Sequence, residues 1–226
     1  MNELEKELAA AEAVKLIQPN MVVGLGTGST AAFMIKLLAE RVKEGLPITA
    51  VSSSEASTTL ATALGITVVP LNKVNQIDIT IDGADEFNPN LELIKGGGGA
   101  LLREKIIAYN TTYNVIITDA SKQVEKLGAF RLPIEVIPFA AHHVTLALTK
   151  MGLDPMVRQN GTEPYTTDEG NYILDTYILE QENLQALEQK LKNIPGIVET
   201  GLFLNTTDMI IVGKNKAVEI IKRTEK

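Results

Sequence analysis

The chain has 226 residues, a formal net charge of −7 and a pI of about 5.0. Its length allows one large domain or two small ones, and its hydrophobic content of 45% excludes a disordered chain. An acidic surface disfavours non-specific binding to nucleic acid or to an anionic membrane, and 4% aromatic residues are too few for base-stacking platforms. We therefore expect neither nucleic acid nor a membrane as a partner.

The sequence contains no cysteine, which excludes disulfides and thiolate metal sites and favours a cytoplasmic protein. The first 15 residues are charged at a period of four and lack the apolar core of a signal peptide. No apolar run reaches the length of a transmembrane helix.

The first half of the chain alternates between predicted strands and helices. Residues 3–16 predict a helix, and residues 21–25 a buried strand. A second helix is expected at 31–44, with Ser29 or Thr30 as its N-cap. Further strands are expected at 48–52, 67–70, 77–81 and 114–118, and further helices at 54–64 and 101–109. This alternation predicts an α/β fold with a Rossmann-like parallel sheet.

The pattern changes near residue 128. We expect a strand between Pro133 and Pro138, a helix at 140–151, β-rich stretches at 155–158 and 172–179, a helix at 184–192 and a strand at 201–205. This β-α-β-β-α-β order is typical of a smaller α+β domain of the ferredoxin-like, split βαβ type. An apolar stretch at 209–212 and a final helix should return to the first domain. The predicted domains are residues 1–127 plus 206–226, which form the Rossmann-like catalytic domain, and residues 128–205.

A glycine-rich turn, Gly-Thr-Gly-Ser-Thr at 26–30, joins a predicted strand to a predicted helix. Backbone N–H groups in such a turn, together with the positive end of the helix, suit a phosphate group. A dinucleotide fingerprint would need glycine where Ser29 stands, and the spacing of a nucleotide P-loop is absent. The alternative is a tight turn that uses glycine for geometry alone.

Acidic residues follow the predicted strand at 77–81, in the run Asp-Gly-Ala-Asp-Glu at 82–86. The carboxyl end of a parallel strand faces the ligand crevice, so Asp82 and Asp85 could converge on one substrate. The alternative is an Asx-turn with a helix cap.

Lys95 and four consecutive glycines, residues 96–99, form the most unusual stretch. Four glycines cost backbone entropy, which favours a close approach of a ligand, and Lys95 supplies a charge for a phosphate or an oxyanion. Glu104 lies in the first turns of the next helix. The alternative for Glu104 is a helix-surface acid paired with Arg103 or Lys105.

The only histidines, His142 and His143, are adjacent, so their rings diverge on a helix. No third ligand stands at zinc spacing, and we interpret both as surface or capping residues and expect no metal site.

In combination, these motifs resemble ribose-5-phosphate isomerase of the A type. The resemblance covers nearly the whole chain in the right order. It rests on Gly-Thr-Gly-Ser-Thr (26–30), Asp-Gly-Ala-Asp-Glu (82–86), Lys-Gly-Gly-Gly-Gly-Ala (95–100), Arg-Glu-Lys-Ile (103–106), Asp-Ala-Ser-Lys (119–122), Leu-Pro-Ile-Glu-Val-Ile-Pro (132–138) and Ile-Pro-Gly-Ile-Val-Glu-Thr-Gly-Leu-Phe (194–203). Two departures are Leu102, where threonine is often expected, and a longer, more polar segment at 159–166.

The resemblance implies an isomerase that interconverts D-ribose 5-phosphate and D-ribulose 5-phosphate through a cis-enediol, without metal or cofactor. It implies that Glu104 moves the proton, that Asp82 and Asp85 handle hydroxyl protons and ring opening, and that Lys95 stabilises negative charge. Lys6 is a further candidate for the phosphate. The implied substrate-binding residues are Thr27, Gly28, Ser29, Thr30, Asp82, Gly83, Ala84, Asp85, Lys95, Gly96, Gly97, Gly98 and Lys122. We also expect a homodimer.

Two other classes of protein use this kind of scaffold. A sugar-phosphate sensor domain of a transcriptional regulator would need a DNA-reading helix-turn-helix, which we expect to be absent, and the acidic pI also argues against it. Acyl transfer to coenzyme A through a glutamate nucleophile would need a larger site than these compact loops suggest. Turnover of ribose 5-phosphate without added cofactor would separate the three classes.

Overall fold

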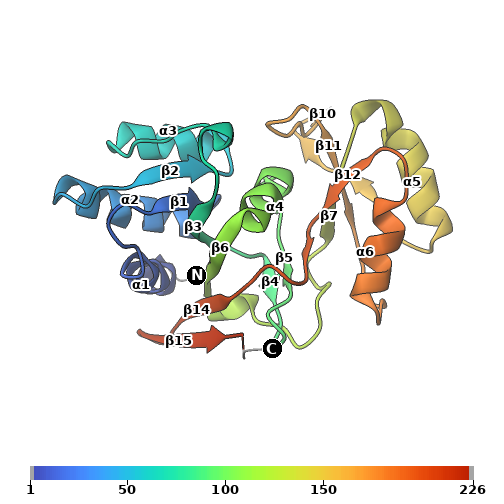
Figure 1. Cartoon of the computed structure of the whole chain (residues 1–226). Coiled ribbons are helices and arrows are strands. Elements are labelled where there is room, and N and C mark those ends of the chain that lie inside the picture. Colours follow the sequence, from blue (N-terminus) through green and yellow to red (C-terminus); the bar gives the residue numbers. More distant parts are fainter. Residues whose placement is uncertain (1–2, 224–226) are drawn as a thin grey trace. The chain divides into compact units, whose positions relative to one another are not determined.

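The computed structural model describes residues 3–223, which form two compact units (Figure 1). The described part of the first unit comprises residues 3–84, 103–123 and 205–223, and the second comprises residues 85–102 and 124–204. Residues 85–102, which the sequence analysis assigned to the first domain, thus pack within the second unit. The division into domains stays a prediction. No helix in residues 3–223 is long and apolar enough to cross a bilayer.

A six-stranded sheet in the order β2-β1-β3-β6-β14-β15 forms the centre of the first unit. Its strands are β1 (Val22–Leu25), β2 (Thr49–Ser52), β3 (Ile77–Asp82), β6 (Thr111–Asp119), β14 (Met209–Lys214) and β15 (Ala217–Lys222). All neighbours pair in parallel except β14 and β15, which confirms the predicted parallel sheet. The strand order reverses at β1, and open α/β sheets bind ligands at such a point, beyond the carboxyl ends of the strands.

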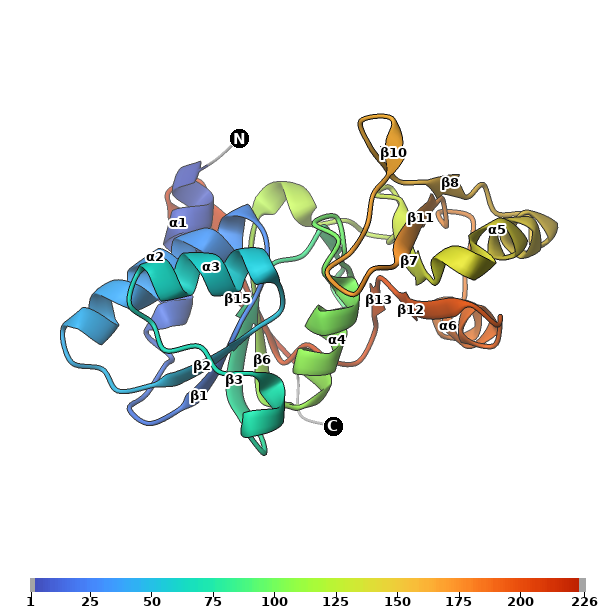
Figure 2. The ribbon, with the colours of Figure 1, turned by 90° about the horizontal axis from the view of Figure 1, so that it is seen from above.

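Helices cover both faces of this sheet. On one side lie α1 (Glu3–Val14), α2 (Ser29–Lys43) and α3 (Glu55–Ala63), as Figure 2 shows. Alternate strand residues such as Leu25, Ile81 and Ile117 point into this core, as the two-residue period of a strand requires. Helix α4 (Leu101–Tyr109) contributes Ile107 to a separate cluster with Val51 and Ile77. The short helices are η1 (Leu71–Lys73) and η2 (Ala120–Lys122).

Two expected details of the first unit are wrong. Ser29 and Thr30 lie inside α2, whose N-cap is Gly28 and has no side-chain hydrogen bond. Residues 67–70 do not form a strand, because the only pairing described there is a single bridge between Val68 and Ala50.

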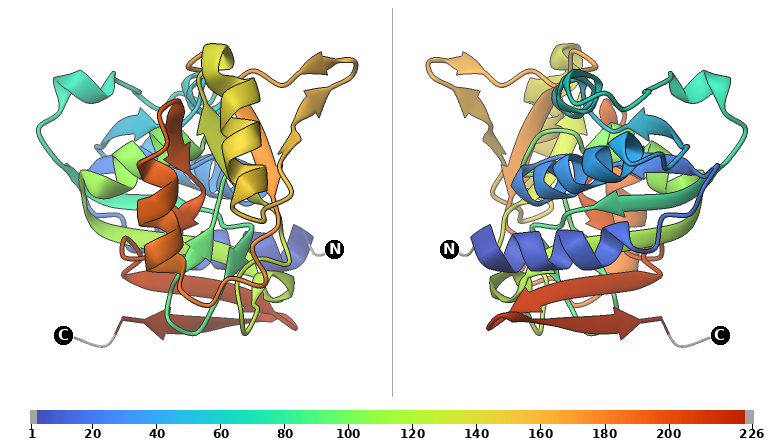
Figure 3. Two further views of the ribbon diagram at one scale, coloured as in Figure 1. Left: turned by 90° about the vertical axis from the view of Figure 1, so that its right-hand side faces the viewer. Right: turned by 90° about the vertical axis from the view of Figure 1, so that its left-hand side faces the viewer.

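The final helix that we expected is also wrong, because residues 217–222 form strand β15. Asn215 and Lys216 have φ angles of 49° and 65°, and these left-handed conformations close a two-residue hairpin between β14 and β15. Both views of Figure 3 show the two strands side by side. The β-branched side chains in this segment favour a strand over a helix.

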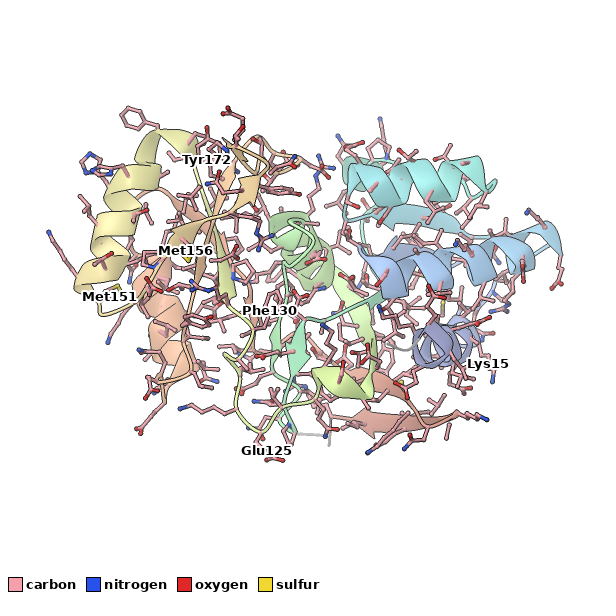
Figure 4. All side chains as sticks on the ribbon, turned by 180° about the vertical axis from the view of Figure 1, so that it is seen from behind. Lys15, Glu125, Phe130, Met151, Met156 and Tyr172 are labelled. Atoms are coloured by element: carbon pink, nitrogen blue, oxygen red, sulfur yellow. The ribbon has the colours of Figure 1, made fainter. Side chains whose placement is uncertain are left out.

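The second unit contains a four-stranded antiparallel sheet in the order β12-β7-β11-β8. Its strands are β7 (Leu132–Val136), β8 (Met156–Val157), β11 (Tyr172–Thr176) and β12 (Ile197–Thr200), and its helices are α5 (Ala141–Lys150) and α6 (Leu184–Lys192). Met156 and Tyr172, labelled in Figure 4, mark β8 and β11. This arrangement confirms the predicted ferredoxin-like α+β domain, although its last strand is β12 and not residues 201–205.

Three smaller elements complete the second unit. Strands β4 (Glu86–Phe87), β5 (Leu93–Ile94) and β13 (Leu202–Phe203) form a short sheet. The hairpin of β9 (Gln159–Asn160) and β10 (Glu163–Pro164) lies between β8 and β11 in the chain, within the polar segment at 159–166. The short helix η3 (Pro138–Ala140) precedes α5.

The two faces of β7 differ in chemistry. Leu132, Ile134 and Val136 belong to the apolar core with α5 and α6, whereas Glu135 is on the opposite face and is buried, with 1% of its surface exposed. Glu135 Oε1 accepts hydrogen bonds from Thr167 Oγ1 at 2.9 Å and from Asn171 Nδ2 at 3.0 Å. Burial raises the pKa of the Glu135 carboxyl above its ordinary value, and these hydrogen bonds oppose the rise without cancelling it.

Glu135→Gln is expected to make the free energy of unfolding less dependent on pH. A carboxyl with a higher pKa in the folded protein binds more protons when folded, so its contribution to stability falls as pH rises from about 4.5 through the raised folded pKa. Glutamine keeps the acceptor for Thr167 and Asn171 but cannot ionise. Urea unfolding across this pH range should show the wild type losing stability relative to the variant. A constant difference between the two proteins would contradict the raised pKa.

Candidate active site

The first group of candidate residues lies where β1 and β3 end. The N–H of Gly26 donates to Ile81 O at 3.0 Å, and the N–H of Thr27 donates to Asp82 Oδ1 at 3.0 Å. Asp82 is buried, and its Oδ1 also accepts the N–H of Gly83 at 2.7 Å. A Cβ on Gly26 would lie 2.1 Å from this Oδ1 and 2.5 Å from Asp82 Cα. Glycine at position 26 therefore makes room for the Asp82 carboxylate.

The Thr27 hydroxyl belongs to a cluster of hydroxyl groups. Thr27 Oγ1 lies 2.7 Å from Ser53 Oγ and donates to Ser54 Oγ at 2.9 Å. Ser57 Oγ donates to Gly26 O at 2.7 Å, so this cluster also fixes the glycine turn. Sequence reasoning missed these serines. Their signal was three consecutive serines, residues 52–54, at the end of a predicted parallel strand, the same edge to which the glycine turn belongs.

The N-terminus of α2 is exposed and has the features that favour an anion. Gly28 has a φ of 99° and open space around its α-carbon, and both Gly28 and Ser29 are exposed. The first N–H groups of α2 have no acceptor within the helix and carry its positive dipole end. Lys6 Nζ, from α1, donates to Ser29 Oγ at 2.8 Å, which adds a cation to this position. A phosphate is the group that this arrangement suits best.

The other predicted site residues of the first unit come from three separate segments of the chain. Glu104 is in the first turn of α4 and is only 6% exposed, so it is not a solvated helix-surface acid. Gly83 and Ala84 follow β3 and are half-buried. Lys122 ends η2, beyond the carboxyl end of β6, and is also half-buried.

The second group of candidates lies in the second unit. Asp85 Oδ2 accepts the N–H of Gly97 at 2.7 Å, and a Cβ on Gly97 would lie 2.5 Å from Asp85 Oδ1. Gly96 has a φ of 104°, and a Cβ there would press on Leu101. Lys95 is 3% exposed, and its Nζ lies 5.5 Å from the centroid of the Phe203 ring. The glycines thus allow a carboxylate to pack directly against the loop.

Glu86, the last residue of the acidic run at 82–86, has a structural role. Glu86 is buried and accepts the N–H groups of Gly128 at 2.7 Å and Phe130 at 2.5 Å, so it holds a loop in place. His142 and His143 are exposed on α5, which confirms them as surface residues. Within residues 3–223, no three histidine or carboxylate side chains are grouped as a metal site would require.

These features together suit proton transfer on a small phosphorylated molecule. A buried carboxylate can act as a general base, and an ammonium group with backbone N–H groups can stabilise an oxyanion. The structure brings Thr27, Asp82 and Gly83 into contact in the first unit, and Asp85 and Gly97 in the second.

Comparisons with known proteins point to one family. A family model described as ribose 5-phosphate isomerase A (phosphoriboisomerase A) matches residues 49–217. The chain is 47% identical over 221 residues to ribose-5-phosphate isomerase A of Sphingopyxis alaskensis, covering 98% of this chain and 97% of the relative. It is 48% identical over 218 residues to the protein of the same name from Levilactobacillus brevis, covering 96% of each.

Solved structures agree with this result. Ribose 5-phosphate isomerase from Plasmodium falciparum superposes with a TM-score of 0.95 at 34% identity, covering 100% of both chains. A D-ribose-5-phosphate isomerase in complex with phospho-erythronic acid superposes with a TM-score of 0.93 at 39% identity, covering 96% of this chain and 97% of the other.

Gly26→Ala is expected to destabilise the protein by about 1–3 kcal/mol, because the new Cβ would meet the backbone and carboxylate of Asp82. Gly83→Ala is the matched control, since a Cβ there meets nothing closer than 3.9 Å. Its free energy of unfolding should stay within about 0.5 kcal/mol of the wild type. Urea unfolding of the two variants measures the difference, and equal stability would show that Asp82 does not depend on this glycine.

Proposed function

The chain belongs to the ribose 5-phosphate isomerase A family, and on this premise we propose that it interconverts D-ribose 5-phosphate and D-ribulose 5-phosphate. The observation that carries this proposal is a buried carboxylate, Asp82, at the point where the strand order reverses, beside the N-terminus of α2 and its lysine. Acids for moving protons and donors for a phosphate thus come from neighbouring strand ends. The reaction belongs to the non-oxidative branch of the pentose phosphate pathway.

We assign the central proton transfer to Glu104. Its carboxylate takes the proton from C2 of the open-chain aldose, the C–H electron pair forms the C1–C2 double bond, and the carbonyl oxygen at C1 gains a proton. The resulting cis-enediol loses a hydroxyl proton at O2 and receives the carried proton at C1, which gives the ketose. The electron pair of the C–H bond stays within the substrate and Glu104 returns a proton to it, so the net reaction consumes no oxidant or reductant. Glu104 is buried in the first turn of α4, and a carboxylate held in place in this way can act as a general base.

The remaining roles follow from charge and hydrogen-bonding capacity. Asp82 and Asp85 move hydroxyl protons and open the sugar ring. Lys95 and the N–H groups of Gly96 and Gly98 stabilise the developing oxyanion. Gly97 contributes by holding Asp85, to which its N–H donates. Asp82 and Asp85 are three residues apart, so the chain itself keeps their α-carbons within about 11 Å.

The phosphate is assigned to the N-terminus of α2. Thr27, Gly28, Ser29 and Thr30 supply hydroxyl and N–H donors there. Lys6, already bonded to Ser29, supplies the charge. The other assigned substrate contacts are Gly83, Ala84 and Lys122.

We further propose that the protein is a homodimer, acts in the cytoplasm and uses no metal or cofactor. The domain division proposed is residues 1–127 plus 206–226 and residues 128–205. The absence of cysteine, which excludes thiolate metal ligands and favours a reducing compartment, supports the cytoplasmic location and the lack of a metal.

The purified protein is expected to convert ribose 5-phosphate at full rate after exhaustive chelation, because the reaction needs only protein acids and bases. Unphosphorylated ribose should lose kcat/KM by orders of magnitude, since the phosphate supplies the binding energy that positions the reacting carbons. A colorimetric assay for ketoses, which detects both ribulose 5-phosphate and ribulose, measures the turnover of both sugars. Activity that disappears with EDTA and returns with a divalent metal, or equal efficiency on both sugars, would overturn the proposal.

Glu104→Gln is expected to lower kcat by about 10²- to 10⁴-fold, because the amide cannot accept the C2 proton. Its KM and thermal stability should remain close to those of the wild type. Glu55→Gln is the matched control, since Glu55 is also a glutamate in the first turn of a helix of the same unit. That control should retain full activity. Near-normal kcat in Glu104→Gln would assign the base to another residue.

A further inference from the structure

The carbonyl groups of the glycine loop, residues 96–98, are all held by two side chains of the second unit. Arg158 Nη1 donates to Gly96 O at 2.9 Å and to Gly97 O at 3.1 Å. Tyr165 OH donates to Gly98 O at 3.3 Å. No motif marked Arg158 or Tyr165, and the mechanism above gives neither a role.

Arg158 is itself rigidly anchored. Its Nε donates to Asp175 Oδ2 at 2.8 Å and its Nη2 to Asp175 Oδ1 at 2.6 Å, which is a bidentate pair. The two side chains are only 16% and 19% exposed, so solvent screens this pair weakly. The backbone N–H of Arg158 also donates to Ile173 O at 2.8 Å, next to β8. One edge of the guanidinium is thus fixed to β11, and the remaining donors reach the loop.

Tyr165 is placed by the same part of the chain. Its backbone N–H donates to Arg158 O at 2.9 Å, across the β9–β10 hairpin. Its hydroxyl group covers Gly99, where a Cβ would lie 2.2 Å from the hydroxyl oxygen. The polar segment at 159–166 therefore brings Tyr165 back to the loop that Arg158 holds.

Holding these carbonyls decides where the loop N–H groups point. A trans peptide is planar, and its C=O and the following N–H point in opposite directions. Gly96 O bonds to Arg158, and the N–H of Gly97, on the other side of that peptide, donates to Asp85 Oδ2 at 2.7 Å. The bond from Arg158 to Gly97 O directs the N–H of Gly98 in the same manner. Four consecutive glycines would not by themselves favour one orientation of these peptide groups.

We propose that Arg158, braced by Asp175 and assisted by Tyr165, is a positioning residue of the isomerase that fixes the peptide between Gly97 and Gly98. The N–H of Gly98 is thereby presented to the substrate oxygen that becomes negative during proton transfer. This inference rests on the proposed function. Because the phosphate is assigned to other residues, loss of Arg158 should lower kcat and leave KM nearly unchanged.

The test compares Arg158→Met with Arg131→Met in the full-length protein. Arg131 is a matched arginine of the second unit: it donates to Asp175 O, pairs with Asp154 and lies 3.8 Å from the Tyr177 ring centroid. None of its described contacts involves residues 96–99. We expect both variants to lose thermal stability. Only Arg158→Met should lose kcat, by about 10- to 100-fold, since small misplacements of catalytic groups cost this much.

Three further measurements separate positioning from general stability. Inhibition by inorganic phosphate should stay within about threefold of the wild type in Arg158→Met, because that anion occupies the α2 position. Arg158→Lys should regain stability but not kcat, since one ammonium cannot hold Asp175 bidentately and also reach two carbonyls. Tyr165→Phe should lower kcat by about two- to fivefold. If Arg158→Met does not fold, the kcat of Tyr165→Phe tests the inference in its place.

Unchanged kcat in Arg158→Met, or in Tyr165→Phe where the arginine variant does not fold, would overturn the inference. An equal loss of kcat in Arg131→Met, or full recovery of kcat in Arg158→Lys, would also overturn it. Failure of the proposed function has a different signature, because the wild type itself would then not convert ribose 5-phosphate.

Discussion

The contact between the Asp82 carboxylate and the bare α-carbon of Gly26 is the constraint on which the first group of site residues depends. With no side chain at position 26, the carboxylate can lie against the end of β1 and accept the N–H groups of Thr27 and Gly83. The bond to Thr27 fixes the path of the chain into α2, and the bond to Gly83 fixes the turn that follows β3. The same contact therefore sets the position of a candidate acid and of the N–H groups assigned to phosphate.

The glycine loop of the second unit needs an additional restraint. Gly97 makes room for the Asp85 carboxylate, as Gly26 does for Asp82, but four consecutive glycines at 96–99 also have much backbone freedom that must be restrained. Ordering the backbone of one residue costs about 1–2 kcal/mol, and more for glycine. Hydrogen bonds to charged groups contribute about 1.5–3 kcal/mol each, so the bonds from Arg158 and to Asp85 can offset much of this cost.

Two acidic side chains of the small sheet lie on the face opposite its apolar core. Residues of β7 and β11 such as Ile134 and Leu174 build an apolar core with α5 and α6. Glu135 and Asp175 lie on the other face, and each has hydrogen-bonding partners. A charge removed from water is tolerated only with such partners, and Arg158, the partner of Asp175, connects the sheet to the glycine loop. The small sheet thus serves as a support for that loop.

The sequence by itself determined the parallel sheet, the ferredoxin-like order of the second unit and the family, because hydrophobic period and glycine-rich motifs are local signals. It also selected Asp82 and Glu104, which the structure buries. Only the tertiary structure decided the contact between Thr27 and Ser53 and the contact between Arg158 and Gly96, which join residues 26 and 62 positions apart in the chain. Such pairings carry no local signal, because whether two distant residues meet depends on how the whole chain packs.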